Sequence, residues 1–348
     1  MINSIPAASL DRALDFLRQR QLPSGEFPCS IVSLLNKFQT RIDSTPFATT
    51  LIASSLAFND SAISKKMIAR ACVFLRAQME PFGVWRYWPR PHPGYKVVRP
   101  DVDDTASVSS VLRQNKVGFP NNRGLLLANR SRAGLFYTWI VLRPALRLNF
   151  GYWWVALEKI RRFRSAHKIW QGEPRPDDID GIVNSNVISY LGPAAYAEPA
   201  CAYLIEVFRQ QQEVSCDRWY QNRFVFYYSI ARNYREGFSS FSVIREELIE
   251  RILSFATTEG AIGSNPMDTA HSICALLDLG ADVPQFDAAV DYLVRKQKTD
   301  GGWPYADYYF SGFLRTVTWG SEELTTGFCV QALSRFLKFS RDRKNSRN

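Results

Sequence analysis

A turn segment that recurs along the chain constrains the fold more than any other feature of this sequence. Its shared residues are a glutamine, a glycine and an aromatic residue. They are Gln21, Gly25 and Phe27; Gln297, Gly301 and Trp303; Gln78 and Trp85; Gln212 and Trp219; and Gly260 alone in a fifth copy. Each copy ends an amphipathic helix and leads into a second helix. Repeats of this length are typical of stacked helical units, so we assign these residues to packing and not to chemistry.

The second helix of each repeat is rich in small residues, and the helix before the turn is more polar. The small-residue helices are predicted near 45–57, 103–113, 181–191, 223–234, 266–279 and 323–334, and the polar helices near 9–20, 66–78, 150–164, 198–212, 243–256 and 286–297. Six such pairs, with few hairpin signals, predict an all-α protein. We expect one α6/α6 double barrel over residues 1–340, although an open solenoid has the same local pattern. We also expect a lid within the insert 114–180 and a flexible basic tail at 341–348.

Composition and net charge limit the kinds of partner or substrate that this chain could bind. The chain has 348 residues with a net charge of +10, 46% hydrophobic and 14% aromatic residues. A basic balance suits nucleic acid, an anionic membrane surface or an acidic substrate. Nucleic acid is the weakest of the three, because long Lys/Arg stripes interleaved with exposed aromatics are absent. Basic stretches such as Arg161–Arg164 are ordinary solvated faces by default, and peripheral membrane contact is the second interpretation.

The six cysteines are scattered without a CxxC pair, and the N-terminus lacks the pattern of a signal peptide. No window of eighteen apolar residues occurs. The sequence therefore predicts a cytoplasmic protein with reduced cysteines.

A cluster of aspartates is the strongest candidate for chemistry. Asp101, Asp103 and Asp104 lie within four positions at the start of the predicted helix 103–113. One of them could simply cap the helix, since carboxylates are favoured there. Three crowded carboxyls repel one another, and this raises the proton affinity of at least one. A neutral carboxylic acid at this position could protonate a weak base.

The stretch DVDDTA resembles the DxDD motif of class II terpene cyclases, the squalene–hopene cyclase superfamily. The repeated turns resemble the QW repeats of that superfamily, and together the two features extend from Gln21 to Trp303. The resemblance implies that the middle aspartate, Asp103, is the proton donor. Asp101 and Asp104 would hold the charge and hydrogen bonds around it.

An amide is expected to orient the donor. Hopene cyclases use a histidine downstream of DxDD, whereas diterpene-type class II enzymes often carry asparagine. We predict that Asn184, at the start of the helix 181–191, hydrogen-bonds Asp103, with Asn186 as the fallback. The alternative for Asn184 is a helix cap or a buried polar contact.

The chain is too short for the two domains of a hopene cyclase and is more similar to single-domain meroterpenoid cyclases of the merosterolic acid synthase type. That resemblance implies an isomerase of the intramolecular transferase type acting on a prenylated hydroxybenzoic acid. Ring faces stabilise carbocations. The aromatic candidates for substrate binding are Phe47, Trp88, Trp139, Phe224, Tyr227, Tyr228, Tyr309 and Trp319, although any one of them could be plain core.

No metal or cofactor is predicted. Asp177, Asp178 and Asp180 have the wrong spacing for the DDxxD motif of class I synthases, and the three histidines are far apart. For an acidic head group the basic candidates are Arg86, Arg90 and Arg315. Two alternatives stay open: a class II cyclase of a prenyl diphosphate, and a non-catalytic helical-repeat binding module.

Overall fold

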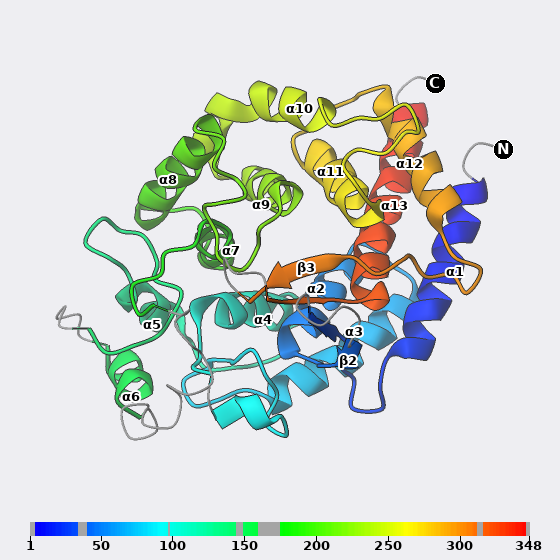
Figure 1. Ribbon diagram of the computed structural model, residues 1–348. Coiled ribbons are helices and arrows are strands. Elements are labelled where there is room, and N and C mark those ends of the chain that lie inside the picture. The colour runs from blue at the N-terminus through cyan, green and yellow to red at the C-terminus, as the bar shows by residue number, and fades with distance from the viewer. Residues whose placement is uncertain are drawn as a thin grey trace.

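Six helices enclose the centre of the molecule (Figure 1). The computed structural model describes residues 4–33, 40–96, 98–143, 149–158, 175–311 and 316–345. The six are α2 (Pro46–Leu56), α4 (Val102–Gln114), α7 (Gly181–Leu191), α9 (Arg223–Arg235), α11 (Pro266–Asp278) and α13 (Glu322–Asn345). Each packs against the next, and α13 packs against α2. We call this closed set the inner ring. Closure decides against the open solenoid.

The more polar helices lie outside the inner ring. They are α1 (Ser4–Arg20), α3 (Ala62–Ala77), α8 (Glu198–Arg209), α10 (Arg245–Leu253) and α12 (Gln285–Lys296), with short 3-10 turns at Pro93–Lys96, Ala195–Ala197 and Ser239–Ile244. Their apolar faces pack inward and their polar faces meet solvent, as an amphipathic pattern requires. The alternation of the two helix types in the sequence is confirmed for these five polar helices, whereas the sixth, predicted near 150–164, lies in the insert described below.

The repeated turns hold neighbouring helix pairs together. The Gln21 amide donates to the carbonyls of Gly25 and Met67, both at 2.9 Å, and the Gln297 amide donates to those of Gly301 and Ser9. Gly25 has φ +98°, and a Cβ there would lie 2.2 Å from the carbonyl oxygen of Arg70. Only glycine fits such a turn. The packing role assigned to these two copies is confirmed.

Threonines tie these turns to the inner ring, a feature that the sequence analysis missed. The backbone N–H after each turn donates to the hydroxyl of a threonine in the first turns of the following inner helix. The pairs are Phe27 with Thr49, Trp85 with Thr105, Ile262 with Thr269, and Trp303 with Thr326, at 3.0–3.2 Å. Each bond satisfies a buried backbone donor and fixes where the inner helix begins.

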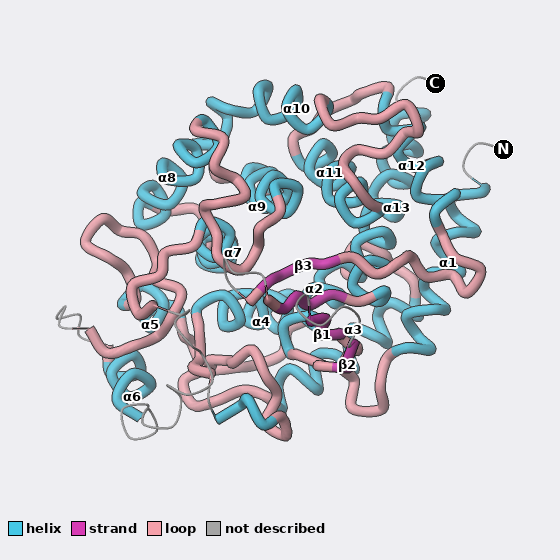
Figure 2. Tube along the Cα trace, in the orientation of Figure 1, coloured by secondary structure: helices cyan, strands magenta, loops and turns pink. Residues whose placement is uncertain are grey.

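The expectation of a purely helical protein is wrong in one place. A four-stranded antiparallel sheet, in the order β2-β1-β4-β3, lies among the helices (Figure 2). Its strands are β1 (Ser30–Ser33), β2 (Thr40–Ile42), β3 (Asp307–Phe310) and β4 (Val317–Gly320). The strands have three or four residues, and β1 pairs with β4 from the other end of the chain. Such short strands give no periodic signal, and their pairing exists only because the inner ring closes.

The insert contributes the short helices α5 (Arg123–Ala128) and α6 (Phe150–Glu158) and a buried wall. Phe136 and Ile140 are fully buried, and Val102 donates to the carbonyl of Thr138 at 3.0 Å. The inner edge of the insert is thus packed against the start of α4. Its residues 144–148 and 159–174 lie outside the described part, as does the basic stretch at 161–164.

The C-terminal helix is longer than expected. Because α13 continues to Asn345, residues 341–345 are helical and not a flexible tail, while 346–348 lie outside the described residues. No helix in the described ranges is long and apolar enough to cross a bilayer. The six cysteines are free thiols, and all but the half-buried Cys216 are buried.

Candidate active site

A cavity lies where the inner helices begin. It holds about 580 Å³ of empty space, counting the part open to solvent. Most of its surface is aromatic or aliphatic, and its polar members are chiefly carboxyls. It is lined by Phe47, Tyr87, Val98, Asp101, Asp103, Asp104, Thr138, Trp139, Val183, Trp219, Tyr220, Tyr309, Phe310 and Trp319. We call it the aspartate cavity. Its lining is typical of a site for a small apolar molecule, with a few placed polar groups.

The three aspartates have different local roles. Asp101 is the N-cap of α4, and its carboxylate accepts from the backbone N–H of Asp104 at 2.8 Å. Asp101 also forms a β-bridge with Trp139 in the insert. The capping explanation therefore applies to Asp101 alone. Asp103, in the first turn of the helix, does not cap it and is available for another role.

Asp103 is held by two donors from other elements. The Nδ2 of Asn186 on α7 donates to Asp103 Oδ1 at 2.7 Å, and the hydroxyl of Tyr220 donates to Oδ2. The Oδ1 of Asn186 in turn accepts from Arg232 Nη2 on α9 at 2.8 Å. Three inner helices and the loop before α9 thus converge on one carboxyl.

The prediction that Asn184 contacts Asp103 is wrong. Asn184 is fully buried, and its amide bonds the backbone of Phe136 and of Asp180. Two residues along a helix turn the side chain by about 200°, so Asn184 and Asn186 point to different faces. Asn184 points to the insert, and Asn186 points to the interior. The buried polar contact weighed as the alternative for Asn184 is what the structure shows.

Burial governs the acidity of this cluster. It raises the pKa of Asp103 to about 6, although the hydrogen bonds from Tyr220 and Asn186 and the charge of Arg232 act in the opposite direction. Burial, helped by the charge of Asp103, raises the pKa of Asp101 to about 7. The pKa of Asp104 is raised further, first by burial and then by Asp101. Crowding contributes as expected for Asp101 and Asp104, but desolvation is the larger cause throughout.

Four of the eight aromatic candidates line the aspartate cavity. Phe47, Trp139, Tyr309 and Trp319 all do so. Tyr309 and Trp319 face each other across β3 and β4 and stack with ring centroids 5.7 Å apart. Phe47 meets the edge of Tyr309 at 5.9 Å.

The other four do not line this cavity. Trp88 donates to Asp43 at 3.0 Å and stacks on His92, one layer behind. Phe224 packs on Phe255 and Tyr227, and Tyr227 bonds Glu213 on the outer side. Tyr228 lines a different cavity described below. For these four the expectation of contact with the aspartate cavity is wrong, because the side of each helix that faces inward depends on packing.

Four further aromatic residues line the cavity and were missed. They are Tyr87, Trp219, Tyr220 and Phe310. Trp219 belongs to one of the repeated turns and was assigned to packing alone. Asp217 fixes this loop, because its carboxylate accepts from the backbone N–H of Trp219 and Tyr220 and from that of Ile182. The sequence did contain one signal for Trp219, namely its position. Its turn leads into an inner helix, at the end of that helix where the cavity lies.

The basic candidates for a head group are not supported. Arg86 is buried in an ion pair with Glu80 and donates to the carbonyls of Tyr95 and Val98. Arg90 is exposed and donates to carbonyls that follow α3. Arg315 lies outside the described residues.

The acidic stretch before α7 is engaged in hydrogen bonds. Asp178 pairs with Arg218 at 3.2 Å, and Asp180 accepts from Thr138 and from the backbone of Arg218. Within the described ranges no group of three His, Cys, Asp or Glu side chains could hold a metal ion.

The chain was compared with known proteins. No protein-family model matches it, and no curated protein matches it. Solved structures do. The type II terpene cyclase MstE from Scytonema is 15% identical, with 97% of this chain and 99% of that chain covered and a TM-score of 0.71. MstE has been solved with its substrate, geranylgeranyl dihydroxybenzoate, and with its product, merosterolic acid A.

Two other likenesses help to interpret this match. The ent-copalyl diphosphate synthase from Streptomyces platensis is 15% identical, with a TM-score of 0.52, 83% of this chain and 50% of that chain covered. An unsaturated glucuronyl hydrolase specific for heparin is 12% identical, with a TM-score of 0.56 and 98% of both chains covered. The fold is thus an α/α barrel of the kind found in terpene cyclases and in a glycoside-cleaving enzyme. Since one scaffold serves both chemistries, function has to be argued from the site.

Proposed function

We propose that this chain is a class II terpene cyclase that converts a linear prenylated aromatic acid into a fused polycyclic meroterpenoid, with Asp103 as the general acid. The observation that carries the proposal is a buried aspartic acid, oriented by two donors, facing a cavity lined mainly by aromatic side chains. A fold like that of MstE, which binds geranylgeranyl dihydroxybenzoate, supports this substrate class. The reaction class is isomerisation, because the product keeps every atom of the substrate.

The chemistry balances within the cavity. The π electrons of the terminal alkene form a C–H bond with the proton of Asp103, whose carboxyl becomes a carboxylate. The tertiary cation that results is attacked in turn by the other alkenes, and each attack forms a ring bond. Loss of a proton from the last cation restores the proton count. Low polarity around Asp103 disfavours its charged form and so favours proton transfer.

The cavity wall is suited to the cations formed on the way. Rings of Phe47, Trp139, Trp219, Tyr309 and Trp319 present faces or edges to the same space. Aromatic faces attract a cation without capturing it as a nucleophile would.

Several wider features belong to the same proposal. We expect the outer helices to complete a double α6/α6 barrel, and the insert 114–180 to act as a lid. We expect a cytoplasmic enzyme, in peripheral contact with membranes, that needs no metal or cofactor.

The test is direct. Purified protein is incubated with farnesyl and geranylgeranyl dihydroxybenzoates and with the matching prenyl diphosphates, and products are sought by mass spectrometry. A product of unchanged mass with fewer alkenes from the benzoates, absent with Asp103→Asn, supports the proposal. Conversion of the diphosphates alone would replace it with the diphosphate cyclase. No conversion, together with tight binding of either ligand, would favour a binding module.

A further inference from the structure

A second cavity lies at the opposite end of the inner ring. It holds about 1530 Å³ of empty space, counting the part open to solvent, and it is polar. Its wall includes six serines and three arginines, and we call it the polar cavity. The serines are Ser54, Ser55, Ser107, Ser110, Ser189 and Ser229, and the arginines are Arg113, Arg232 and Arg235.

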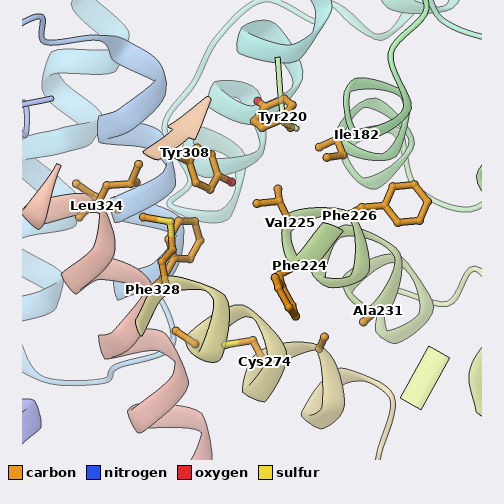
Figure 3. Packing of buried hydrophobic residues seen from close by; sticks show 14 of the residues in the cluster. Ile182, Tyr220, Phe224, Val225, Phe226, Ala231, Cys274, Tyr308, Leu324 and Phe328 are labelled. Carbon is orange, nitrogen blue, oxygen red and sulfur yellow. The ribbon is translucent and has the colours of Figure 1, made fainter. Parts of the chain in front are cut away.

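Asp103 lines the aspartate cavity, and its two hydrogen-bond donors belong to different cavities. Asn186, which bonds its Oδ1, lines the polar cavity, whereas Tyr220, which bonds its Oδ2, lines the aspartate cavity. Tyr220 also packs against Tyr308, which lines the polar cavity, with ring centroids 5.7 Å apart. Figure 3 shows these two side chains near each other, with Ile182 and Val225 beside them. The two oxygens of one carboxyl therefore face opposite sides. Only a proton on Oδ2 lies on the side of the aromatic cavity.

The hydrogen bonds behind Oδ1 run in one direction. Arg232 Nη2 donates to Asn186 Oδ1, and Asn186 Nδ2 donates to Asp103 Oδ1. A guanidinium has only donors and does not lose its proton in proteins. The amide oxygen must therefore face Arg232, and the amide N–H must face Asp103. Oδ1 is held as an acceptor by an N–H that cannot itself accept, so the acid proton is left to Oδ2, which keeps a lone pair for the Tyr220 hydroxyl.

We propose, as a refinement that rests on the proposed cyclase function, that Arg232 is a positioning residue that fixes the orientation of the Asn186 amide and thereby keeps the acid proton of Asp103 on the oxygen facing the substrate. Without Arg232 the amide can rotate and present its own oxygen to Asp103. That oxygen would then accept the acid proton on the side away from the alkene.

The placement of Arg232 fits this role. No carboxylate within 4 Å of it is found among the described residues, and its buried Nε has no hydrogen-bond partner. Its nearest aromatic contact is Tyr228, with 5.9 Å from the guanidinium carbon to the ring centroid. Its positive charge lowers the pKa of Asp103.

Other charged groups around Asp103 must be kept constant in any test. Asp101 and Asp104 lie on its own helix, Asp180 precedes α7, Asp217 and Tyr220 precede α9, and Tyr308 lies on β3. None of them is altered in the variants chosen here.

The variants are Arg232→Met, Arg232→Lys and the matched control Arg113→Met. Arg113 lines the same polar cavity and carries the same charge, but its ring partner is Tyr190 on the far side of that wall. We expect kcat to fall by about tenfold or more in Arg232→Met, with KM changed little, because a misdirected acid affects the transition state and not binding. Arg232→Lys should lose less, because its ammonium also has only donors. The pH above which activity is lost should rise by about one unit in Arg232→Met, since an opposite charge is removed. Arg113→Met should match the unaltered protein.

Two measurements make the test decisive. Guanidinium ion, added to Arg232→Met, should restore part of kcat, because the polar cavity gives it access to the vacated position. Titration of 13C-labelled aspartate carboxyls without substrate should show a higher pKa for Asp103 in Arg232→Met, with Asp103→Asn used to assign the signal. This readout needs no turnover, so it separates failure of this inference from failure of the cyclase proposal. An unchanged carboxyl titration, or equal effects in Arg113→Met, would overturn it.

Discussion

The two ends of the inner ring are built from the same helices and yet differ in chemistry. Phe47, Asp103 and Val183 lie near the starts of α2, α4 and α7 and line the aspartate cavity, while Ser55, Ser110 and Ser189, further along the same helices, line the polar cavity. One end is lined mainly by aromatic and aliphatic side chains, and the other carries serines and arginines. The difference shows how a single barrel can surround an acid with apolar side chains on one side and hydrogen-bond it from the other.

Two opposing effects act on the pKa values of the acids at the start of α4. The starts of helices carry partial positive charge and favour carboxylates, an effect that lowers acid pKa values. The pKa values of Asp101 and Asp103 are nevertheless raised, to about 7 and about 6, because burial outweighs it. Burial at the aromatic end therefore raises the pKa of the acid, and donors from both ends, Tyr220 and Asn186, orient it.

The largest effect is expected from removing the acid at the boundary. Asp103→Asn should reduce cyclisation to less than a few per cent, since an amide keeps the shape but cannot supply a strong-acid proton. Product formation is followed by mass spectrometry, with thermal unfolding and substrate binding as controls. Substantial turnover in a folded Asp103→Asn protein would assign the donor to another group.

The second-largest effect is expected to distinguish the roles of the two asparagines of α7, Asn184 and Asn186. Asn186→Ala should lower kcat by about tenfold or more while leaving stability almost unaltered. Asn184→Ala should do the reverse, because it breaks buried bonds to Phe136 and Asp180 and costs about 1–3 kcal/mol of unfolding free energy. Measuring kcat and the free energy of urea unfolding for both variants tests this difference. If Asn184→Ala stays stable but loses activity, Asn186 has been given the wrong role.

A smaller effect is expected on the aromatic wall. Trp219→Leu keeps an apolar side chain at the cavity but removes a ring face, and this should raise the share of incompletely cyclised products while turnover continues. Trp303→Leu is the matched control, because Trp303 donates to the carbonyl of Leu293 in the same kind of turn, away from the cavity. It should lower stability and leave the product pattern alone. Identical product patterns for all three proteins would remove Trp219 from the site.

Stability should depend on pH through the same acids. Burial raises the pKa values of Asp101, Asp103 and Asp180 to about 7, about 6 and about 6, well above those of an unfolded chain. The folded state then binds more protons between these pKa values and those of the unfolded chain, so the stabilisation from these acids is full below about pH 4 and is lost as pH rises from there through 6–7. Asp103 alone accounts for about 3 kcal/mol at most. Urea midpoints from pH 5 to 8 should slope less in Asp103→Asn, and an unchanged slope would contradict the buried acid.

The smallest effect should come from chelation. Proton-initiated cyclisation needs no departing diphosphate, and Asp178 and Asp180 are already bonded to Arg218 and Thr138. Dialysis against EDTA should leave the rate unchanged. A loss of activity that magnesium restores would favour the diphosphate substrate instead.

Much of this protein was determined by the sequence alone, because the features concerned are local. The positions of α2, α4, α7, α9 and α11 follow from hydrophobic period and caps, and the turns at Gly25 and Gly301 follow from spacing. The aspartate cluster at the start of α4 was equally visible.

Only the tertiary structure decided which side chains meet. Asn184 and Asn186 lie in a helix that is apolar on most sides, so no pattern distinguishes inside from outside, and about 200° of rotation separates them. Tyr220 and Tyr309 reach the cavity through a loop held by Asp217 and through a strand paired with Trp319. Arg232 reaches Asn186 across 46 residues. These contacts depend on closure of the inner ring, a property of the whole chain and not of any local segment.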